Sequence, residues 1–419
     1  MVQKVTAKKA ISFIESHQSI FVHGGVAVPQ ALIRSLLQRA SELENMEIMH
    51  LHTNGDASYA HPQYRGHFKV CNFFVGPNIR PYIDFDSVDY LPCFLSEIPS
   101  LFRSGRKKVD VAFLHVSPPD EHGYCSLGTS VDVARAAFES AKLIIAQVNP
   151  RMPRVFGDGV IPFDKIHFAV EVDEALPEVP TKPLTEVEKS IGRNVAGLVE
   201  NGATLQLGIG SIPDAVLAAL DGHKNLGLHT EMWSDGAIPL LEKGIIDNSR
   251  KMIHPGKSIS SFVIGTKRLY DFIHNNPSVM QLDSSYVNNP SVICRNKKVT
   301  AINSAVEIDL TGQVCADSIG RHIISGVGGQ IDFIRGASLS EKGKPIIAIT
   351  SRTHKGIPRI VKMLKEGAGV VTTRAHVHFV VTEYGVAELF GRTLGERAKA
   401  LIAIAHPEDR EALESHWKQ

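Results

Sequence analysis

The chain has 419 residues, of which 43% are hydrophobic and 21% are charged, and its formal net charge is +1. These values are typical of a globular protein with more than one domain, and the charge balance argues against a nucleic-acid partner. Because no apolar stretch is long enough to cross a membrane and the five scattered cysteines form no CxxC pair, we expect a cytoplasmic protein with neither a disulfide framework nor a zinc site.

Apolar, β-branched runs alternate with amphipathic segments along the chain. The predicted strands are Ser19–His23, Ile48–His52, Phe68–Val75, Val109–Val116, Leu143–Val148, Thr204–Leu207, Ser260–Ile264, Val299–Asn303, Ile346–Thr350 and Val377–Thr382. The predicted helices are Pro29–Leu43, Val131–Lys142, Glu186–Glu200, Pro213–Leu220, Ile357–Lys365 and Gly395–Ile404. This alternation predicts an α/β fold with mostly parallel sheets.

An internal repeat divides the chain into two halves. Gly, Pro and Ala recur at a constant offset in Gly24–Leu32 and Gly208–Val216, each time after a predicted strand and before a predicted helix. A looser match pairs Asp120–Gly128 with Asp309–Gly320. The segment 170–183 is rich in proline and acidic residues, as a linker is. We therefore predict two pseudo-equivalent α/β domains, residues 1–180 and 181–419.

A glycine-rich turn, Leu207-Gly-Ile-Gly-Ser-Ile-Pro213, lies between a predicted strand and a predicted helix. Its glycines would let backbone N–H groups approach a ligand oxygen, although an unliganded strand–helix turn explains the pattern equally well. The turn nearly matches the dinucleotide fingerprint GxGxxG, with Pro213 in place of the third glycine. A nicotinamide-dependent dehydrogenase, with Glu231 as its ribose ligand, therefore stays open as an alternative.

Glu231 falls late in the strand-like run Leu226-Gly-Leu-His-Thr-Glu-Met-Trp-Ser-Asp-Gly236, which breaks into a Ser-Asp-Gly turn. A carboxylate at a strand end, facing glycine amides, has the parts for acyl transfer: the carboxylate attacks and the amides stabilise the oxyanion. In a strand, His229 and Trp233 would share the face of Glu231, and Trp233 could help to exclude water. A solvated acidic residue that caps the turn is the simpler interpretation.

Two further segments could meet a ligand. Ser325-Gly-Val-Gly-Gly-Gln-Ile-Asp-Phe-Ile-Arg335 holds three glycines in four residues and has apolar flanks, which indicates a packed loop. Thr353-His-Lys-Gly-Ile-Pro-Arg359 places Lys355 and Arg359 beside a glycine, where they could bind a phosphate or could simply be solvated.

Two His-x-His pairs, His50/His52 and His376/His378, each place two imidazoles on one face of a predicted strand. With Asp56 or His61 they could form a metal site, and hence a metal-dependent hydrolase. Isolated pairs of this kind are weak predictors, and no metal is expected.

Three runs resemble signatures of the acetyl-CoA hydrolase/transferase family of class I CoA-transferases: Thr230–Gly236, Gly326–Phe333 and Val381–Gly391. The similarity extends over essentially the whole chain. Within the family it is greatest to 4-hydroxybutyrate and butyrate:acetate CoA-transferases. The resemblance implies two α/β domains of the NagB/RpiA/CoA-transferase type and a ping-pong reaction through a glutamyl-CoA thioester.

Carried over by motif, the resemblance also implies roles for individual residues. Glu231 would be the catalytic glutamate. Backbone and CoA contacts would come from Gly208, Ile209, Gly210, Ser211 and Lys355, with a second amide donor at Gly328 or Gly329. Asn288 and Glu383 would be polar residues near the acceptor.

The resemblance further implies acyl-CoA and short-chain carboxylates as substrates, with coenzyme A as a substrate rather than a permanently bound cofactor, and a homo-oligomer of two or more chains. The alternatives are an acyl-CoA hydrolase of the same family, the dehydrogenase, and a non-catalytic sensor of CoA esters. The sequence leaves open the acceptor acid and the balance between transfer and hydrolysis.

Overall fold

A computed structural model describes residues 2–418, which form two compact units. The first unit comprises the chain up to Val179 together with Ile259–Tyr286, and the second comprises Pro180–Ser258 together with the chain from Val287 onward. The boundary predicted after residue 180 lies one residue from the observed boundary between Val179 and Pro180. The prediction did not include the return of segment 259–286 to the first unit. In that segment β17 (Val279–Gln281) pairs in parallel with β9 (Phe156–Gly157), although no change of composition marks its ends.

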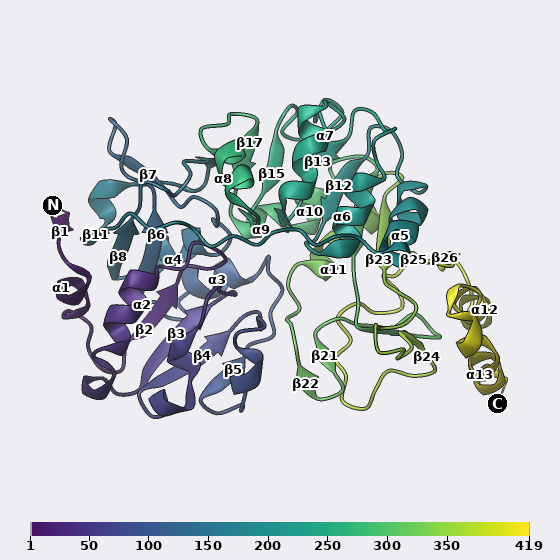
Figure 1. Cartoon of the computed structure of the whole chain (residues 1–419), viewed down its shortest axis with the longest axis horizontal. Coiled ribbons are helices and arrows are strands. Elements are labelled where there is room, and N and C mark those ends of the chain that lie inside the picture. The colour runs from purple at the N-terminus through teal and green to yellow at the C-terminus, as the bar shows by residue number, and fades with distance from the viewer. Residues whose placement is uncertain (1, 419) are drawn as a thin grey trace. The chain divides into compact units, whose positions relative to one another are not determined.

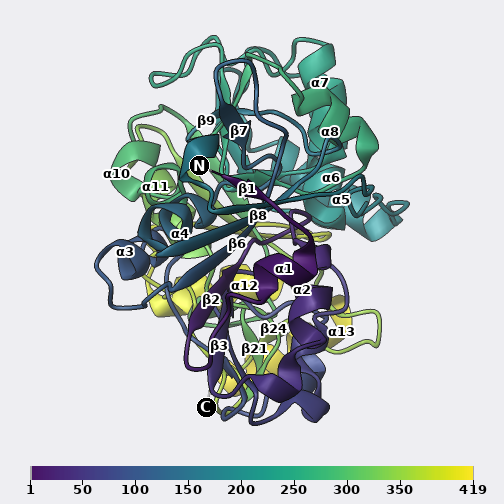
Figure 2. The ribbon, with the colours of Figure 1, turned by 90° about the vertical axis from the view of Figure 1, so that its left-hand side faces the viewer.

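The first unit is built on an eight-stranded sheet in the order β1-β11-β8-β6-β2-β3-β4-β5, whose neighbours all pair in parallel. Its strands are β1 Gln3–Lys4, β2 Ser19–Val22, β3 Met46–His50, β4 Phe68–Asn72, β5 Val88–Tyr90, β6 Val111–Val116, β8 Leu143–Val148 and β11 Phe168–Glu171. Its helices are α1 Ala7–Ile11, α2 Gln30–Leu37, α3 Ile98–Arg103, α4 Ala134–Ser140 and α8 Lys267–Ile273. Helices α1 and α2 lie side by side (Figures 1 and 2). Every residue of β6 is buried, as expected for a central parallel strand covered on both faces.

The second unit is built on a six-stranded sheet in the order β13-β12-β18-β23-β25-β26, parallel except for the β25–β26 hairpin. Its strands are β12 Thr204–Leu207, β13 Gly227–Leu228, β18 Val299–Asn303, β23 Lys344–Ala348, β25 Phe379–Thr382 and β26 Gly385–Glu388. Its helices are α5 Glu186–Ala196, α6 Ser211–Ala218, α7 Ile238–Glu242, α10 Pro290–Ile293, α11 Gln330–Leu339, α12 Leu394–Ile404 and α13 Pro407–Trp417. Capping boxes at Thr185/Glu188 and Thr393/Glu396 start α5 and α12.

The two sheets share one strand order. The series β11-β8-β6-β2-β3 in the first unit corresponds to β25-β23-β18-β12-β13 in the second, with the strands taken in the same sequence order. In each unit a glycine turn follows the equivalent member of this series, β2 or β12, and leads toward α2 or α6. The prediction of an α/β fold with two pseudo-equivalent parallel sheets is confirmed.

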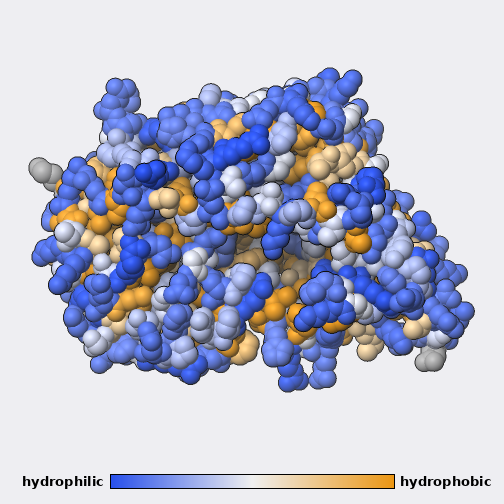
Figure 3. Space-filling view, viewed as in Figure 1, coloured by the Kyte–Doolittle hydropathy of each residue, from blue (hydrophilic) through white to orange (hydrophobic). Residues whose placement is uncertain are grey.

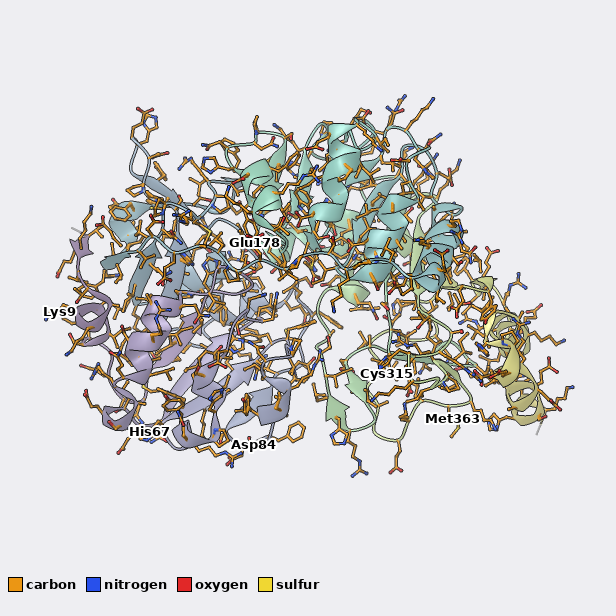
Figure 4. All side chains as sticks on the ribbon, viewed as in Figure 1. Lys9, His67, Asp84, Glu178, Cys315 and Met363 are labelled. Carbon is orange, nitrogen blue, oxygen red and sulfur yellow. The ribbon has the colours of Figure 1, made fainter. Side chains whose placement is uncertain are left out.

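Smaller elements complete both units. The first unit adds β7 Tyr124–Ser126 paired with β10 Val160–Pro162, and the second adds β19 Glu307–Asp309, β20 Val314–Cys315, β24 Ile360–Val361, β21 Ser318–Ile319 and β22 His322–Ile323. Short strands β14 (Met232–Trp233), β15 (Ser258–Ser260) and β16 (Phe262–Val263) and helix α9 (Ser284–Val287) occupy the remaining connections. Figure 4 labels Cys315, whose side chain is buried, and Met363, which is 72% exposed.

One predicted helix is wrong. Residues 357–365 do not form a helix, because the β-branched pair Ile360–Val361 becomes β24 and pairs in parallel with β19. The predicted strand 260–264 is also divided, between β15 and β16. Within residues 2–418 no helix is long and apolar enough to cross a membrane. Figure 3 shows hydrophilic residues over most of the visible face, with hydrophobic residues scattered among them.

Candidate functional site

The glycine turn at the end of β12 is open on its outer side. Gly210 has φ 116° and ψ 179°, a conformation that only glycine adopts without strain, and it immediately precedes α6. A Cβ atom placed on Gly208 or Gly210 would have no heavy atom within 4 Å. The turn therefore leaves room for a ligand next to backbone N–H groups at the start of a helix.

Glu231 lies three residues beyond the end of β13, the strand that pairs in parallel with β12. The strand predicted to carry it stops at Leu228, and the chain resumes as β14 at Met232. His229, Glu231 and Trp233 therefore do not form one continuous strand face. Trp233 is 2% exposed and belongs to the core of its unit.

Thr230 connects the glycine turn to this segment. Its hydroxyl accepts a hydrogen bond from the Leu207 N–H at 3.2 Å and lies 2.9 Å from the Leu207 carbonyl oxygen. The same hydroxyl is 2.9 Å from the Met232 carbonyl oxygen, and the residue is fully buried. A single side chain thus holds together the last residue of β12 and the two residues on either side of Glu231.

The second glycine loop contacts Glu231 from the start of α11. Gly329 is the residue before this helix, and a Cβ atom placed on it would overlap the Glu231 Oε2 and Asn288 Nδ2 atoms. Asn288 donates a hydrogen bond from Nδ2 to Glu231 Oε2 at 2.9 Å and is fully buried. The Asn288 Oδ1 atom has no hydrogen-bond partner among the described residues, so it remains available as an acceptor.

His229 and Lys251 support the segment through its backbone. Burial lowers the pKa of His229 to about 3, so its ring is neutral at pH 7 and Nε2 donates to the Val287 carbonyl oxygen at 2.9 Å. Val287 directly precedes Asn288. The Lys251 ammonium donates to the Leu228 oxygen at 2.9 Å and to the Lys257 oxygen at 2.6 Å, while burial lowers its pKa to about 7.

A polar cleft of about 870 Å³ opens elsewhere in the second unit. Glu383 lines it and accepts hydrogen bonds from the Ser351 N–H at 2.9 Å and the Ser351 hydroxyl at 2.6 Å. Arg359 also lines it, and its Nε is buried without a hydrogen-bond partner among the described residues. Lys355 is exposed, between the lining residues His354 and Gly356.

Glu188 links the cleft to the glycine turn, because it lines the cleft and hydrogen-bonds with Ser211 at the end of the turn. This residue lines the cleft, and partial burial opposes its ionisation, but hydrogen bonds with the Ser211 and Thr185 side chains lower the pKa of Glu188 overall. Ser211 is the first residue of α6 after the glycine turn. The cleft therefore reaches the start of α6, where the glycine turn ends.

The structure groups the predicted residues into two sets. Glu231, Asn288 and Gly329 are in contact, and Ser211, Lys355 and Glu383 lie at or beside the cleft. Gly328 has φ 57° and shapes the loop. Sequence reasoning missed Thr230 as the link to the glycine turn, as well as Lys251 and Ser351, since these residues look ordinary until the strands are assembled.

Among the described residues, neither His-x-His pair lies in a cluster of potential metal ligands. His50 is buried and its ring packs against Tyr59, while half-buried His52 packs against Phe74 and Phe262. Between residues 2 and 418, no group of three or more His, Cys, Asp or Glu side chains is arranged to hold a metal ion.

Comparison with known proteins identifies relatives over nearly the whole length. Residues 2–180 match the N-terminal domain of acetyl-CoA hydrolase/transferase, and residues 265–417 match the C-terminal domain. The chain is 50% identical to the 4-hydroxybutyrate coenzyme A transferase of Clostridium kluyveri, with 99% of this chain and 97% of that protein covered.

Two further relatives extend the comparison. The chain is 50% identical to a succinyl-CoA:acetate/propanoyl-CoA:succinate CoA transferase of Fasciola hepatica, over 97% of this chain and 86% of the relative. The crystal structure of a 4-hydroxybutyrate CoA-transferase from Porphyromonas gingivalis superposes with a TM-score of 0.86 at 40% identity, covering 99% of this chain and 97% of the other.

Proposed function

Because the chain is a CoA-transferase belonging to the acetyl-CoA hydrolase/transferase family, we propose that it moves CoA between acetyl-CoA and a short-chain carboxylate through a thioester on Glu231. The observation that carries this proposal is the contact of the Glu231 carboxylate with Asn288 and with the second glycine loop, inside a unit whose first glycine turn is held to residue 230. A carboxylate held by a side-chain amide against a glycine loop has the parts that acyl transfer needs.

The first half-reaction loads the enzyme. A Glu231 oxygen attacks the thioester carbonyl of acetyl-CoA, and the C–S bond breaks to give an acetyl-glutamyl anhydride and the CoA thiolate. The thiolate then attacks the side-chain carbonyl of Glu231. Acetate leaves, and a glutamyl-CoA thioester remains on the enzyme.

The second half-reaction reverses these steps with another acid. The acceptor carboxylate attacks the glutamyl thioester, which releases the thiolate and forms a new anhydride. The thiolate attacks the acyl carbonyl of the acceptor, and the Glu231 carboxylate is regenerated. No net hydrolysis occurs, so the energy of the thioester is retained in the product and neither ATP nor a permanently bound cofactor is required.

Each tetrahedral intermediate carries an oxyanion that needs hydrogen-bond donors. Backbone N–H groups at Gly208–Ser211 and at Gly329 are the proposed donors, and Gly329 is favoured over Gly328 because it directly contacts the Glu231 carboxylate. The loss of one such donor costs about a hundred- to a thousand-fold in rate in other enzymes. The Asn288 amide would hold the carboxylate between attacks.

We propose 4-hydroxybutyrate as the acceptor, with succinate as the main rival. Relatives that are equally similar to the chain carry names with these different acids, so identity alone does not separate them. A pocket distinguishes a single methylene by only about 1–3 kcal/mol, so overlapping use of acids that differ only in chain length is expected, whereas succinate differs from 4-hydroxybutyrate by a second carboxylate. Hydrolysis is the alternative within the family, and it would require water to reach the glutamyl thioester. We also propose that the chain works as a homo-oligomer.

Mass spectrometry of the wild type and Glu231→Ala after incubation with acetyl-CoA tests the proposal. We expect a CoA adduct on the peptide that contains Glu231, absent from the variant, and present in Glu411→Ala, which removes an exposed carboxylate of α13. Adding 4-hydroxybutyrate, succinate or butyrate separately, with water alone as the reference, ranks the acceptors and measures hydrolysis. If several acyl-CoA donors gave neither an adduct nor turnover, a dehydrogenase or a CoA-ester sensor would become the better interpretation.

A further inference from the structure

The backbone next to Glu231 is bonded in an unusual way. At the end of β12 both the N–H and the carbonyl of Leu207 lie within hydrogen-bond distance of the Thr230 hydroxyl, at 3.2 and 2.9 Å. One residue pair earlier the ladder is still formed by main chain, since the His229 N–H donates to the Leu205 carbonyl at 3.0 Å. The Thr230 side chain thus replaces main-chain atoms as the hydrogen-bond partner of Leu207, at the point where β12 and β13 separate.

The first unit contains the counterpart of this junction. Strand β3 is equivalent to β13 in strand order. His52-Thr53-Asn54 lies one residue beyond the end of β3, and His229-Thr230-Glu231 directly follows β13. Gly25 is the residue that faces Thr53, with which it forms a parallel bridge, as Leu207 faces Thr230, although the glycine-turn repeat aligns Gly25 with Ile209. There the ladder continues through main-chain atoms, with Gly25 N–H donating to the His52 oxygen at 2.8 Å and Asn54 N–H donating to the Gly25 oxygen at 3.0 Å.

The two threonines therefore have different partners. The Thr53 hydroxyl lies 3.3 Å from the Tyr59 hydroxyl and accepts from the Asn78 side chain, whereas main-chain groups satisfy Gly25. In the second unit the Thr230 hydroxyl is the hydrogen-bond partner of the facing residue, Leu207, whereas in the first unit main-chain atoms are the partners of Gly25. Thr230 is also bonded to the Met232 carbonyl oxygen, so the peptide units around Glu231 turn away from β12 and toward Asn288 and Gly329.

We infer that Thr230 is a positioning residue, whose buried hydroxyl fixes the distance between the glycine turn and the Glu231 carboxylate. This inference rests on the proposed role of Glu231 and adds a residue that does not touch the substrate. The hydroxyl offers its single proton to Leu207 or Met232 while it accepts from the Leu207 N–H, so it can tie both segments together at once. Without this hydroxyl, the distance between the backbone N–H groups of the glycine turn and the Glu231 carboxylate would no longer be fixed.

The pair Thr230→Ser and Thr230→Ala isolates the hydroxyl, because both variants lose the methyl group and only the serine keeps the oxygen. We expect Thr230→Ser to stay within about threefold of the wild-type kcat. We expect Thr230→Ala to lose about a hundred-fold in kcat, the cost typical of a displacement of about 1 Å at a reacting group, with KM for acetyl-CoA within about twofold. The rate at which the CoA adduct forms on the Glu231 peptide should fall in parallel with kcat.

Thr300→Ala is the matched control. This threonine is 2% exposed in β18, and its hydroxyl donates to the nearby Lys298 carbonyl at 3.2 Å. The substitution should lower the melting temperature as a buried truncation does and leave kcat unchanged. Should Thr230→Ala fail to fold, the isosteric Thr230→Val replaces it in the comparison with serine.

The possible outcomes separate this inference from the proposed function. If Glu231→Ala still turned over and formed the adduct, the proposed function would fail first. If the wild type formed the adduct but Thr230→Ala had the same kcat as Thr230→Ser, Glu231 would keep its role and the positioning role of Thr230 would be refuted. An equal loss of kcat in Thr230→Ala and Thr300→Ala would assign the effect to general destabilisation and would also overturn the inference.

Discussion

Replacing Gly329 by alanine tests the contact between the second glycine loop and the proposed nucleophile. Gly329 has φ −101° and ψ 9°, which alanine can adopt, so the change introduces no backbone strain of its own. Its Cβ would nevertheless overlap Glu231 Oε2 and Asn288 Nδ2 and lie 3.1 Å from Glu231 Cδ. The carboxylate and the amide cannot both keep their positions, and their 2.9 Å hydrogen bond must open.

The size of the effect follows from this overlap. To restore ordinary contact, the Glu231 carboxylate has to move by about 1 Å or more, and misplacement on that scale costs about a hundred-fold in rate, which corresponds to about 2.7 kcal/mol of activation free energy. We expect kcat in Gly329→Ala to fall by that factor or more. The free energy of unfolding should also fall, by the roughly 1–3 kcal/mol typical of overpacking at a buried site, so kcat is compared among variants that are folded at the assay temperature.

The assay combines steady-state kinetics, thermal unfolding and the rate of CoA adduct formation. Gly222→Ala is the control, since a Cβ atom on Gly222 would have no heavy atom within 4 Å and this glycine does not have a positive φ. Gly328→Ala provides a contrast. Gly328 has φ 57°, so alanine there should mainly cost stability, by about 1–2 kcal/mol. A folded Gly329→Ala enzyme with kcat within about threefold of wild type would refute the placement of Glu231 against this loop during the reaction.

Two further predictions concern Asn288 and His50. Asn288→Ala removes the donor to Glu231 Oε2 and no longer holds the carboxylate in place, and since misplacement of about 1 Å at a reacting group costs about a hundred-fold in rate, kcat/KM should fall by up to about a hundred-fold. Asn276→Ala, in a turn of the first unit, should have no effect in the same kinetic assay. An Asn288→Ala enzyme as active as the wild type would refute the proposed role of Asn288 in holding the carboxylate. Burial lowers the pKa of His50 from about 6.5 to about 3, so between these pH values the unfolded chain binds more protons than the folded chain. The contribution of His50 to the free energy of unfolding is therefore fully present above pH 6.5 and is lost as the pH falls. For this one group the loss from pH 7 to pH 5 is about 2 kcal/mol, and urea unfolding of His50→Phe, which keeps the packing on Tyr59, should show a correspondingly flatter pH dependence. An identical pH dependence in both proteins would show that His50 takes up no proton on unfolding.

Local patterns predicted the framework of the fold. Leu143–Val148, Thr204–Leu207 and Val299–Asn303 form strands with the predicted bounds, because each is a buried run inside a parallel sheet and its apolar character depends little on its neighbours. The offset between the two glycine turns likewise anticipated the repeated strand order. The helix predicted at 357–365 was wrong because Ile360 and Val361 pair with a strand that lies far earlier in the chain, which no local pattern reports.

The candidate site depended more on the resemblance to a family. From the residues alone, a solvated Glu231 and an unliganded glycine turn were equally good or simpler interpretations, and Asn288 entered only through the resemblance. Thr230 looked like an ordinary strand residue until Leu207 was placed beside it. Lys251 could not be assigned at all, since its ammonium reaches the carbonyl of Leu228 from a connection 23 residues away. Contacts between segments distant in sequence decide these roles.

The repeated strand order leaves the two halves of the chain chemically unequal. His52-Thr53-Asn54 and His229-Thr230-Glu231 lie beyond equivalent strands, and they differ at one position, where an amide stands in place of a carboxylate. An amide side chain cannot attack a thioester as a carboxylate does. If Glu231 is the nucleophile, the first half therefore contributes the scaffold at this position and the second half alone contributes the reacting group.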